Sequence, residues 1–135
     1  MQVPSEITYH QVSNTLELAY EDGFRCCLPA EYLRISSPSA EVQGHTPDQA
    51  QLPVGKKNVR IVDIEPIGLY AIKIVFSDGH DSGYYDWEYL RVLGQEQTDR
   101  WQRYLDQLQA MDASRDPDDL RNDIFKPVAK KSCRH

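Results

Sequence analysis

The chain has 135 residues, of which 40% are hydrophobic and 27% charged, and its formal net charge is −6. This length and composition indicate one soluble globular domain that is large enough to fold without a metal or disulfide. The acidic balance argues against nucleic-acid binding, and no apolar run is long enough to span a membrane. The N-terminus lacks a basic segment followed by an apolar one, so we expect no signal peptide. Three cysteines, two of them adjacent, indicate no disulfide framework and favour a cytoplasmic location.

The segment from residue 7 to residue 28 is predicted to form three short strands. In residues 16–20, Leu and Tyr alternate with Glu and Ala, a period of two that is typical of a strand with one buried face. The Asp-Gly pair at residues 22–23 favours a tight hairpin turn, because it accepts positive φ angles. The strand that follows places Cys26 and Cys27 on opposite faces, where we interpret both as packing residues.

Proline and glycine delimit the elements that follow. Pro29 presets the φ angle of a first helical turn, so residues 30–34 are predicted to form one short helix. Between residues 35 and 58, Pro, Gly and Ser interrupt every period, which predicts a long loop. Residues 59–64 and 69–76 each alternate in polarity and are predicted to pair as strands, with a Pro-Ile-Gly turn between them.

The C-terminal half contains the clearest helical pattern. After a polar turn at residues 77–83 and a short strand at 84–85, Asp86 is placed to cap a helical turn or two. Residues 95–111 are predicted to form an amphipathic helix. Its apolar stripe consists of Trp101, Tyr104, Leu105, Leu108 and Met111. The tail, residues 113–135, has a net charge of +2 and leaves −8 on the rest. Such a tail is solvated, folds back onto the acidic body or contacts an acidic partner.

Three stretches of the sequence together carry a family resemblance. They are residues 16–34, with Asp22-Gly23 and LPAEYLR, residues 59–72, with GLYAI, and residues 76–91, with FSDGHDSGYY. In order and spacing, over about residues 6–94, this set resembles the gamma-butyrobetaine hydroxylase-like N-terminal domain. In bacteria that domain also occurs alone, as a domain of unknown function, or fused to ATPases of iron–sulfur cluster assembly.

The resemblance implies an α+β fold, a small antiparallel β-sheet domain with short helices. This chain adds a C-terminal amphipathic helix and a flexible tail to it. We therefore divide the chain into the family domain at 1–94, the added helix at 95–112 and a mobile polar tail at 113–135.

The resemblance also implies a structural zinc, held by three cysteines after a Leu-Arg pair and by a distant histidine. At those positions this chain has Ser37, Ser39, Val42 and His80. A serine hydroxyl stays protonated and valine has no donor atom, whereas structural zinc requires four ligands. We therefore predict that this zinc site is vacant and that the protein carries no cofactor. Between the carboxylates of its turn, His80 is interpreted as a structural residue.

The sequence indicates no catalytic centre. Residues 78–83 lack the spacing of either nucleotide-binding fingerprint, and His80 with a neighbouring Asp supplies only half of a non-haem iron triad. We therefore expect a binding domain rather than an enzyme. Its partner is a protein or a second copy of the chain, with no nucleic acid and no membrane.

The residues expected at the partner surface are Arg34, His80, Tyr85, Tyr89 and Arg91, because Arg and aromatic residues are favoured at interfaces. Trp87 is expected in the core instead. One alternative is an accessory factor in metal or iron–sulfur cluster handling, which the family's fusions suggest. A second is a small-ligand-binding or enzymatic domain.

Overall fold

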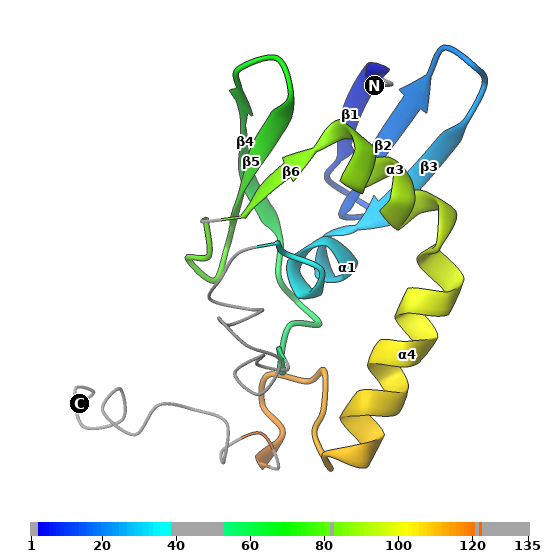
Figure 1. Ribbon diagram of the computed structural model, residues 1–135. Helices are drawn as coiled ribbons and strands as arrows, with labels where there is room; N and C mark the ends of the chain where they lie inside the picture. Colours follow the sequence, from blue (N-terminus) through cyan, green and yellow to red (C-terminus); the bar gives the residue numbers. More distant parts are fainter. Residues whose placement is uncertain (1–2, 39–52, 82, 121, 123–135) are drawn as a thin grey trace.

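The computed structural model describes residues 3–38, 53–81, 83–120 and 122, and it has two antiparallel three-stranded sheets with helices beside them (Figure 1). The first sheet consists of β1 (Pro4–His10), β2 (Thr15–Tyr20) and β3 (Arg25–Pro29), followed by α1 (Ala30–Ile35). The second consists of β4 (Ile61–Ile67), β5 (Ala71–Phe76) and β6 (Tyr84–Asp86), followed by α3 (Trp87–Gln95) and α4 (Gln97–Ala110). The predicted α+β class is confirmed, although its strands form two sheets. Among the described residues, no helix is long and apolar enough to cross a membrane.

The first sheet follows the predicted alternation. Leu16 and Leu18 are fully buried, and the turn after β2 places Gly23 at a φ of +93°, where an L side chain would be strained. On β3, Cys26 is half-buried under α3 and Cys27 is exposed, so the two thiols lie on opposite faces as predicted. Burial raises the pKa of the Cys26 thiol to about 11, which makes it an inert packing residue.

The second sheet departs from the predicted pattern in two places. A β-bulge between Ile61 and Asp63 shifts the register, so Ile61 and Ile64 both turn toward the core and Val62 is exposed. The turn after β4 covers residues 68–70 instead of the predicted 66–68, and in it Gly68 adopts a positive φ of 55°. Pro66 is accommodated within β4, which is an edge strand and tolerates the missing N–H.

Buried tyrosines join the helices to the core that lies between them and the sheets. Tyr32 and Tyr85 are at most 1% exposed, yet each hydroxyl donates a hydrogen bond to a helix carbonyl. The Tyr32 hydroxyl reaches Leu93 O at 2.7 Å, and the Tyr85 hydroxyl reaches Leu33 O at 2.6 Å. These bonds fix α1 and α3 against each other across the core.

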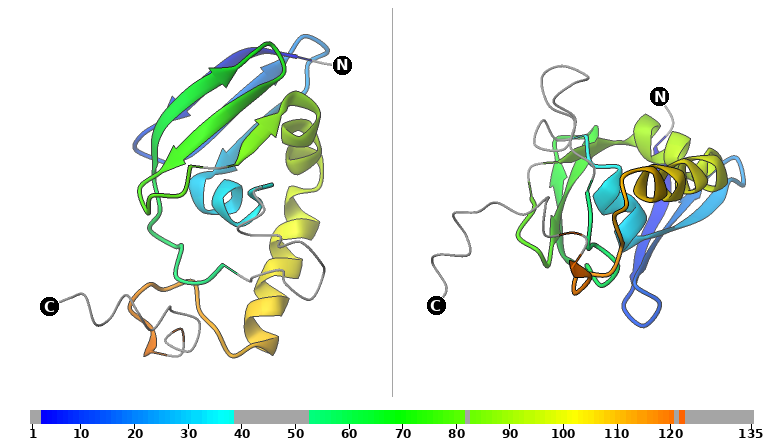
Figure 2. Two further views of the ribbon diagram at one scale, coloured as in Figure 1. Left: turned by 60° about the vertical axis from the view of Figure 1, so that its left-hand side comes forward. Right: turned by 90° about the horizontal axis from the view of Figure 1, so that it is seen from below.

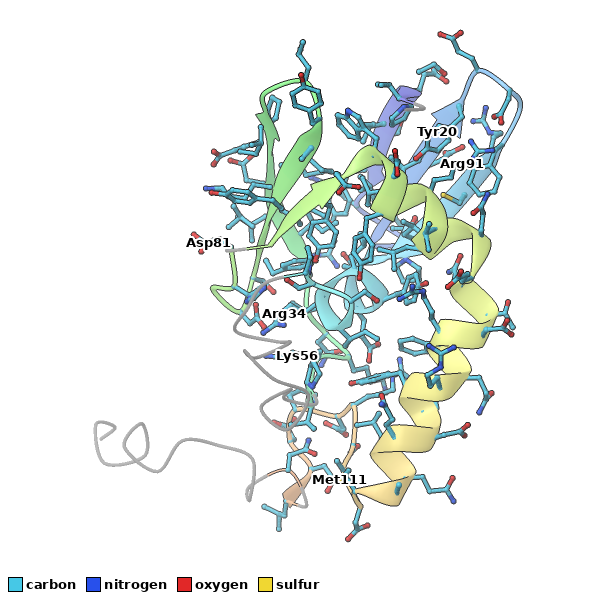
Figure 3. The ribbon with its side chains drawn as sticks, in the orientation of Figure 1. Tyr20, Arg34, Lys56, Asp81, Arg91 and Met111 are labelled. Carbon is cyan, nitrogen blue, oxygen red and sulfur yellow. The ribbon has the colours of Figure 1, made fainter. Side chains whose placement is uncertain are left out.

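The helical region is divided into two helices at Glu96. As predicted, Asp86 caps α3, its carboxylate accepting the Tyr89 N–H at 2.7 Å. In α4, Tyr104 and Leu108 are buried, and Trp101 packs edge-on against Tyr32 with ring centroids 6.4 Å apart. Met111 was predicted to belong to the same stripe, but it is 50% exposed. The helix ends at Ala110, so the residue no longer continues the stripe (Figure 3).

Part of the predicted tail folds back onto the body of the protein. Gly55 N–H donates to Ser114 O and Lys57 N–H donates to Arg115 O, both at 2.9 Å. The Asn122 side chain is 1% exposed. Its amide oxygen accepts the Ser114 N–H and its amide nitrogen donates to Ser114 O, so the two ends of this segment are held together. Figure 2 shows residues 113–120 beside the chain that precedes β4.

The close approach of α3 to β3 leads to a first prediction. A Cβ at Gly94 would lie 2.6 Å from the Sγ and 2.9 Å from the Cβ of Cys26, closer than real contacts. We expect Gly94→Ala to lower the free energy of unfolding by about 1–2 kcal/mol, because overpacking outweighs alanine's better helix propensity. Urea unfolding measures this change. Cys26→Ala in the same chain should recover part of the loss, and a stabilised single variant would contradict the close packing.

Candidate functional site

Two of the positions that the resemblance assigned to zinc meet in the structure. Ser37 follows the end of α1, and His80 lies in the turn between β5 and β6. The Ser37 Oγ and the His80 Nε2 are 2.8 Å apart in a hydrogen bond, and the two residues are 0% and 7% exposed. Gly83 passes so close to the Ser37 hydroxyl that a side chain at residue 83 would collide with it. Ser39 and Val42 lie outside the described residues.

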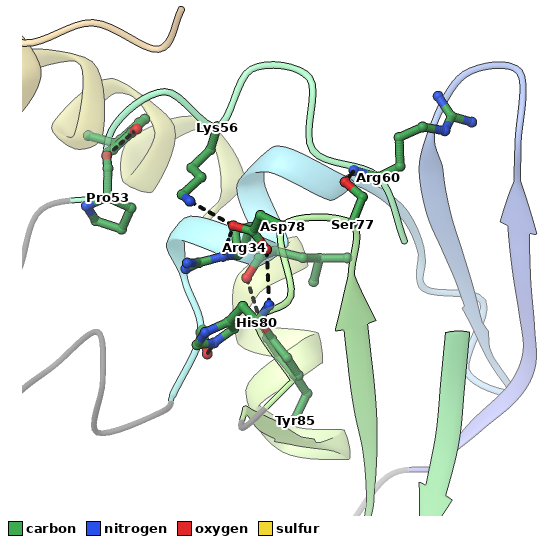
Figure 4. A network of polar contacts seen from close by, with 11 residues as sticks. Arg34, Pro53, Lys56, Arg60, Ser77, Asp78, His80 and Tyr85 are labelled. Carbon is green, nitrogen blue, oxygen red and sulfur yellow. Dashed lines mark hydrogen bonds and ion pairs between the residues drawn. The ribbon is translucent and has the colours of Figure 1, made fainter. Parts of the chain in front are cut away.

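A carboxylate beside this pair joins three segments of the chain (Figure 4). Asp78 Oδ2 accepts hydrogen bonds from Arg34 Nε at 2.9 Å and Lys56 Nζ at 2.7 Å. Its Oδ1 accepts the backbone N–H of His80 at 3.2 Å. Burial by itself would raise the pKa of Asp78, but the Lys56 hydrogen bond and the two cationic charges outweigh it and hold the pKa at about 2. The cluster therefore keeps a charged carboxylate well below neutral pH.

The residues present do not fit a zinc ion. Ser37 offers a hydroxyl where a structural zinc would need a thiolate. The Nε2 atom of His80 already forms a hydrogen bond with this hydroxyl. The described part of the chain contains no group of three or more His, Cys, Asp or Glu side chains that could hold a metal. Ser37, His80 and Asp78 therefore form what we call the polar junction, a set of structural contacts between the end of α1 and the β5–β6 turn.

The five residues expected at a partner surface make contacts within the chain. Arg34 and His80 belong to the Asp78 cluster. The Tyr89 hydroxyl donates to Ser36 O at 2.6 Å, and Tyr85 is fully buried, so its predicted exposure is wrong. The alternation on β6 points Tyr84 outward instead, where its side chain is 55% exposed.

Arg91 is similarly engaged. Its guanidinium makes a bidentate ion pair with Asp22, with a shortest distance of 2.7 Å, and lies 4.9 Å from the centre of the Tyr20 ring (Figure 3). It also lies 4.5 Å from the Phe24 ring centre. This residue clamps α3 to the β2–β3 turn, so binding a partner would require these contacts to open.

A second arginine cluster was not found from the sequence. Arg115 donates from Nε and Nη2 to the two carboxylate oxygens of Glu31, both at 2.7 Å, and its guanidinium carbon lies 5.1 Å from the centre of the Trp101 ring. A pocket of about 420 Å³ adjoins the cluster. No local pattern indicates this pair, because its partners are 84 residues apart and each is typical of a solvated position.

The outer face of the second sheet carries several exposed apolar side chains. By register, Glu65, Lys73 and Tyr84 form one row across it, and Ile67, Ala71 and Asp86 form the next. At the end of the β4–β5 hairpin, Leu69 is 80% and Tyr70 63% exposed. We call these eight residues the outer β4–β6 face; within the described chain, the helices lie on the other side of the sheet (Figure 2).

The chain belongs to the gamma-butyrobetaine hydroxylase-like N-terminal family, whose sequence profile matches residues 7–91. A protein solved in solution by NMR is 46% identical, with a TM-score of 0.77 over 95% of this chain and 98% of that one. Another NMR structure is 43% identical, with a TM-score of 0.74 and 87% coverage of both chains.

A crystal structure of a protein of unknown function from Acidithiobacillus ferrooxidans ATCC 23270, of the DUF971 family, is 37% identical. Its TM-score is 0.57 over 67% of this chain and 91% of that one. No curated protein matches the chain. The family is thus the one that the sequence motifs indicated.

Asp78 makes the stability of the protein depend on pH. Because its folded pKa of about 2 lies below the ordinary value of 3.8, its contribution is complete above about pH 4 and is lost as the pH falls through 2. Because Asp78 is partly exposed, solvent screening limits this contribution to about 1 kcal/mol, less than the shift by itself would give. We expect Asp78→Asn to lower stability at pH 7 and to flatten the loss between pH 4 and 2 in urea unfolding. Asp118→Asn, at an exposed position, is the matched control, and equal curves for both variants would contradict this assignment.

The donor set at Ser37 and His80 leads to a prediction about metal content. We expect tag-free protein purified without chelator to contain far less than one zinc per chain by elemental analysis. Ser37→Ala should lower the thermal stability without changing the metal content, because it removes the hydrogen bond to His80 and no ligand. A stoichiometric zinc that survives dialysis would refute this interpretation.

Proposed function

We propose that the protein is a non-catalytic binding module and that the outer β4–β6 face receives a basic, apolar segment of a partner protein. The observation that carries this proposal is the presentation of two large apolar side chains, Leu69 and Tyr70, on a rigid hairpin end. Exposed apolar clusters of this kind are typical of interaction sites.

The backbone beneath these side chains is held in place by one residue. Trp87 Nε1–H donates to Leu69 O at 2.8 Å, and Trp87 N–H donates to Tyr70 O at 3.1 Å. Because the turn is already ordered, its side chains can bind a partner with little further loss of conformational entropy.

The charges of the face indicate the chemistry of the partner. Glu65 and Asp86 lie on it with a single cation, Lys73, which is 3.6 Å from Glu65. Asp63 is also exposed, on β4 opposite Val75. An apolar end bordered by carboxylates is complementary to a segment that carries aromatic or aliphatic anchors and Lys or Arg. The formal charge of −6 opposes association of two copies through the same surface.

Selection of peptides tests this function without a known partner. We expect a random peptide library panned on the whole protein to enrich basic sequences with an aromatic or aliphatic anchor. The double variant L69S/Y70S should bind those peptides at least tenfold more weakly, since anchors at an interface centre carry most of the affinity.

Leu120→Ser is the matched control, because Leu120 is also 80% exposed but lies outside the second sheet. Peptides that bind L69S/Y70S and the wild type equally would overturn the assignment of the face. Enrichment of acidic peptides would overturn the chemistry proposed for the partner. Sedimentation velocity at rising concentration reports self-association, and a dimer abolished by L69S/Y70S would replace the partner protein by a second copy.

A further inference from the structure

Arg115 occupies a site built by two other elements of the fold. Glu31 comes from α1 and accepts both Nε–H and Nη2–H of the guanidinium at 2.7 Å. Trp101 comes from α4 and presents its ring face to the same group, 5.1 Å from the ring centre to the guanidinium carbon. A guanidinium group is recognised by a carboxylate within hydrogen-bond distance and by an aromatic ring face within about 6 Å.

The carboxylate is the permanent part of this site. The Glu31 side chain is only 8% exposed, whereas the Arg115 side chain is 37% exposed. The Trp101 ring is held by its edge-on contact with the buried Tyr32, at an interplanar angle of 79°. A buried carboxylate without a cation is strongly destabilising, so the site favours having an occupant.

The occupant belongs to a segment with little apolar anchorage. In residues 113–120 only Ala113 is buried among the apolar side chains, and Leu120 is 80% exposed. Two backbone hydrogen bonds, to the amides of Gly55 and Lys57, hold this segment to the body. Segments with few buried apolar contacts open at a low free energy compared with global unfolding.

Space for a larger ligand lies next to the guanidinium. The pocket of about 420 Å³ is bordered by the cluster and by Pro29, Gln97, Thr98 and Gln102. Its walls thus combine an apolar ring with amide and hydroxyl groups, which suit the backbone of a short peptide. Arg115 borders this pocket and leaves the volume unfilled.

We propose that Glu31 and Trp101 form an arginine-binding site that Arg115 fills in cis, and that an arginine side chain of another polypeptide binds there when residues 113–120 move away. A lysine cannot replace it, because an ammonium group does not form the planar bidentate pair. The site lies on α1 and α4, across the molecule from the β4–β5 hairpin (Figure 1), and it stands independently of the proposed function.

The test removes the Arg115 side chain and offers a small arginine derivative in its place. We expect Arg115→Ala to unfold at a lower temperature than the wild type, and Nα-acetyl-arginine amide at millimolar concentration to raise that temperature. Nα-acetyl-lysine amide at the same ionic strength should have little effect. The R115A/E31Q variant should not respond to either probe, and the wild type should respond less than R115A because its site is filled.

A second measurement keeps the test decisive if R115A is poorly folded. In Arg115→Lys the arginine probe should still shift the Trp101 indole N–H signal in NMR spectra, and the lysine probe should not. Equal effects of the two probes, or an unchanged response after Glu31→Gln, would overturn the proposal. L69S/Y70S should respond to the probes as the wild type does, so failure here leaves the proposed function untouched.

Discussion

The arrangement of this protein depends on tyrosine hydroxyls that bond to the carbonyl groups at helix ends. The last carbonyls of a helix have no partner within the helix and must find one when they are buried. Here three tyrosines supply the partners, at distances of 2.6–2.7 Å: Tyr85 to Leu33 O, Tyr89 to Ser36 O and Tyr32 to Leu93 O. Each bond joins elements that are distant in sequence, so α1, α3 and the second sheet are fixed together. The rings fill the core while the hydroxyls satisfy the backbone.

The same kind of bonding holds together the region where the resemblance placed a zinc ion. The end of α1 is held by Tyr85, by Tyr89 and by the Ser37–His80 hydrogen bond, and Asp78 adds ion pairs with Arg34 and Lys56. These contacts join the chain around the end of α1 to the β5–β6 turn. Neutral hydrogen bonds in a buried site are sufficient there because several act on one short segment. The polar junction is therefore a structural feature, and the two binding surfaces that we propose lie elsewhere.

Two such surfaces differ in how they are prepared for a ligand. The outer β4–β6 face is open, with Leu69 and Tyr70 presented by a turn whose carbonyls are bonded to Trp87. The Glu31–Trp101 site is filled, and its occupant comes from the chain itself. An open apolar face confers affinity through burial, whereas a carboxylate with an aromatic ring confers selectivity for one side chain.

The sequence by itself determined the features that depend only on residues close together in the chain. The period of two along β2, the positive φ at Gly23 and the Asp86 cap of α3 each involve only neighbouring residues, and each was predicted. The motifs along the chain also identified the family.

Tertiary structure alone decided what depends on contacts between distant residues. The bulge in β4 reversed the alternation after Ile61, packing against Leu33 turned Tyr85 inward, and Arg115 met Glu31 across 84 residues of chain. The physical reason is that burial and charge pairing are set by which surfaces meet, and neither periodicity nor composition specifies that meeting.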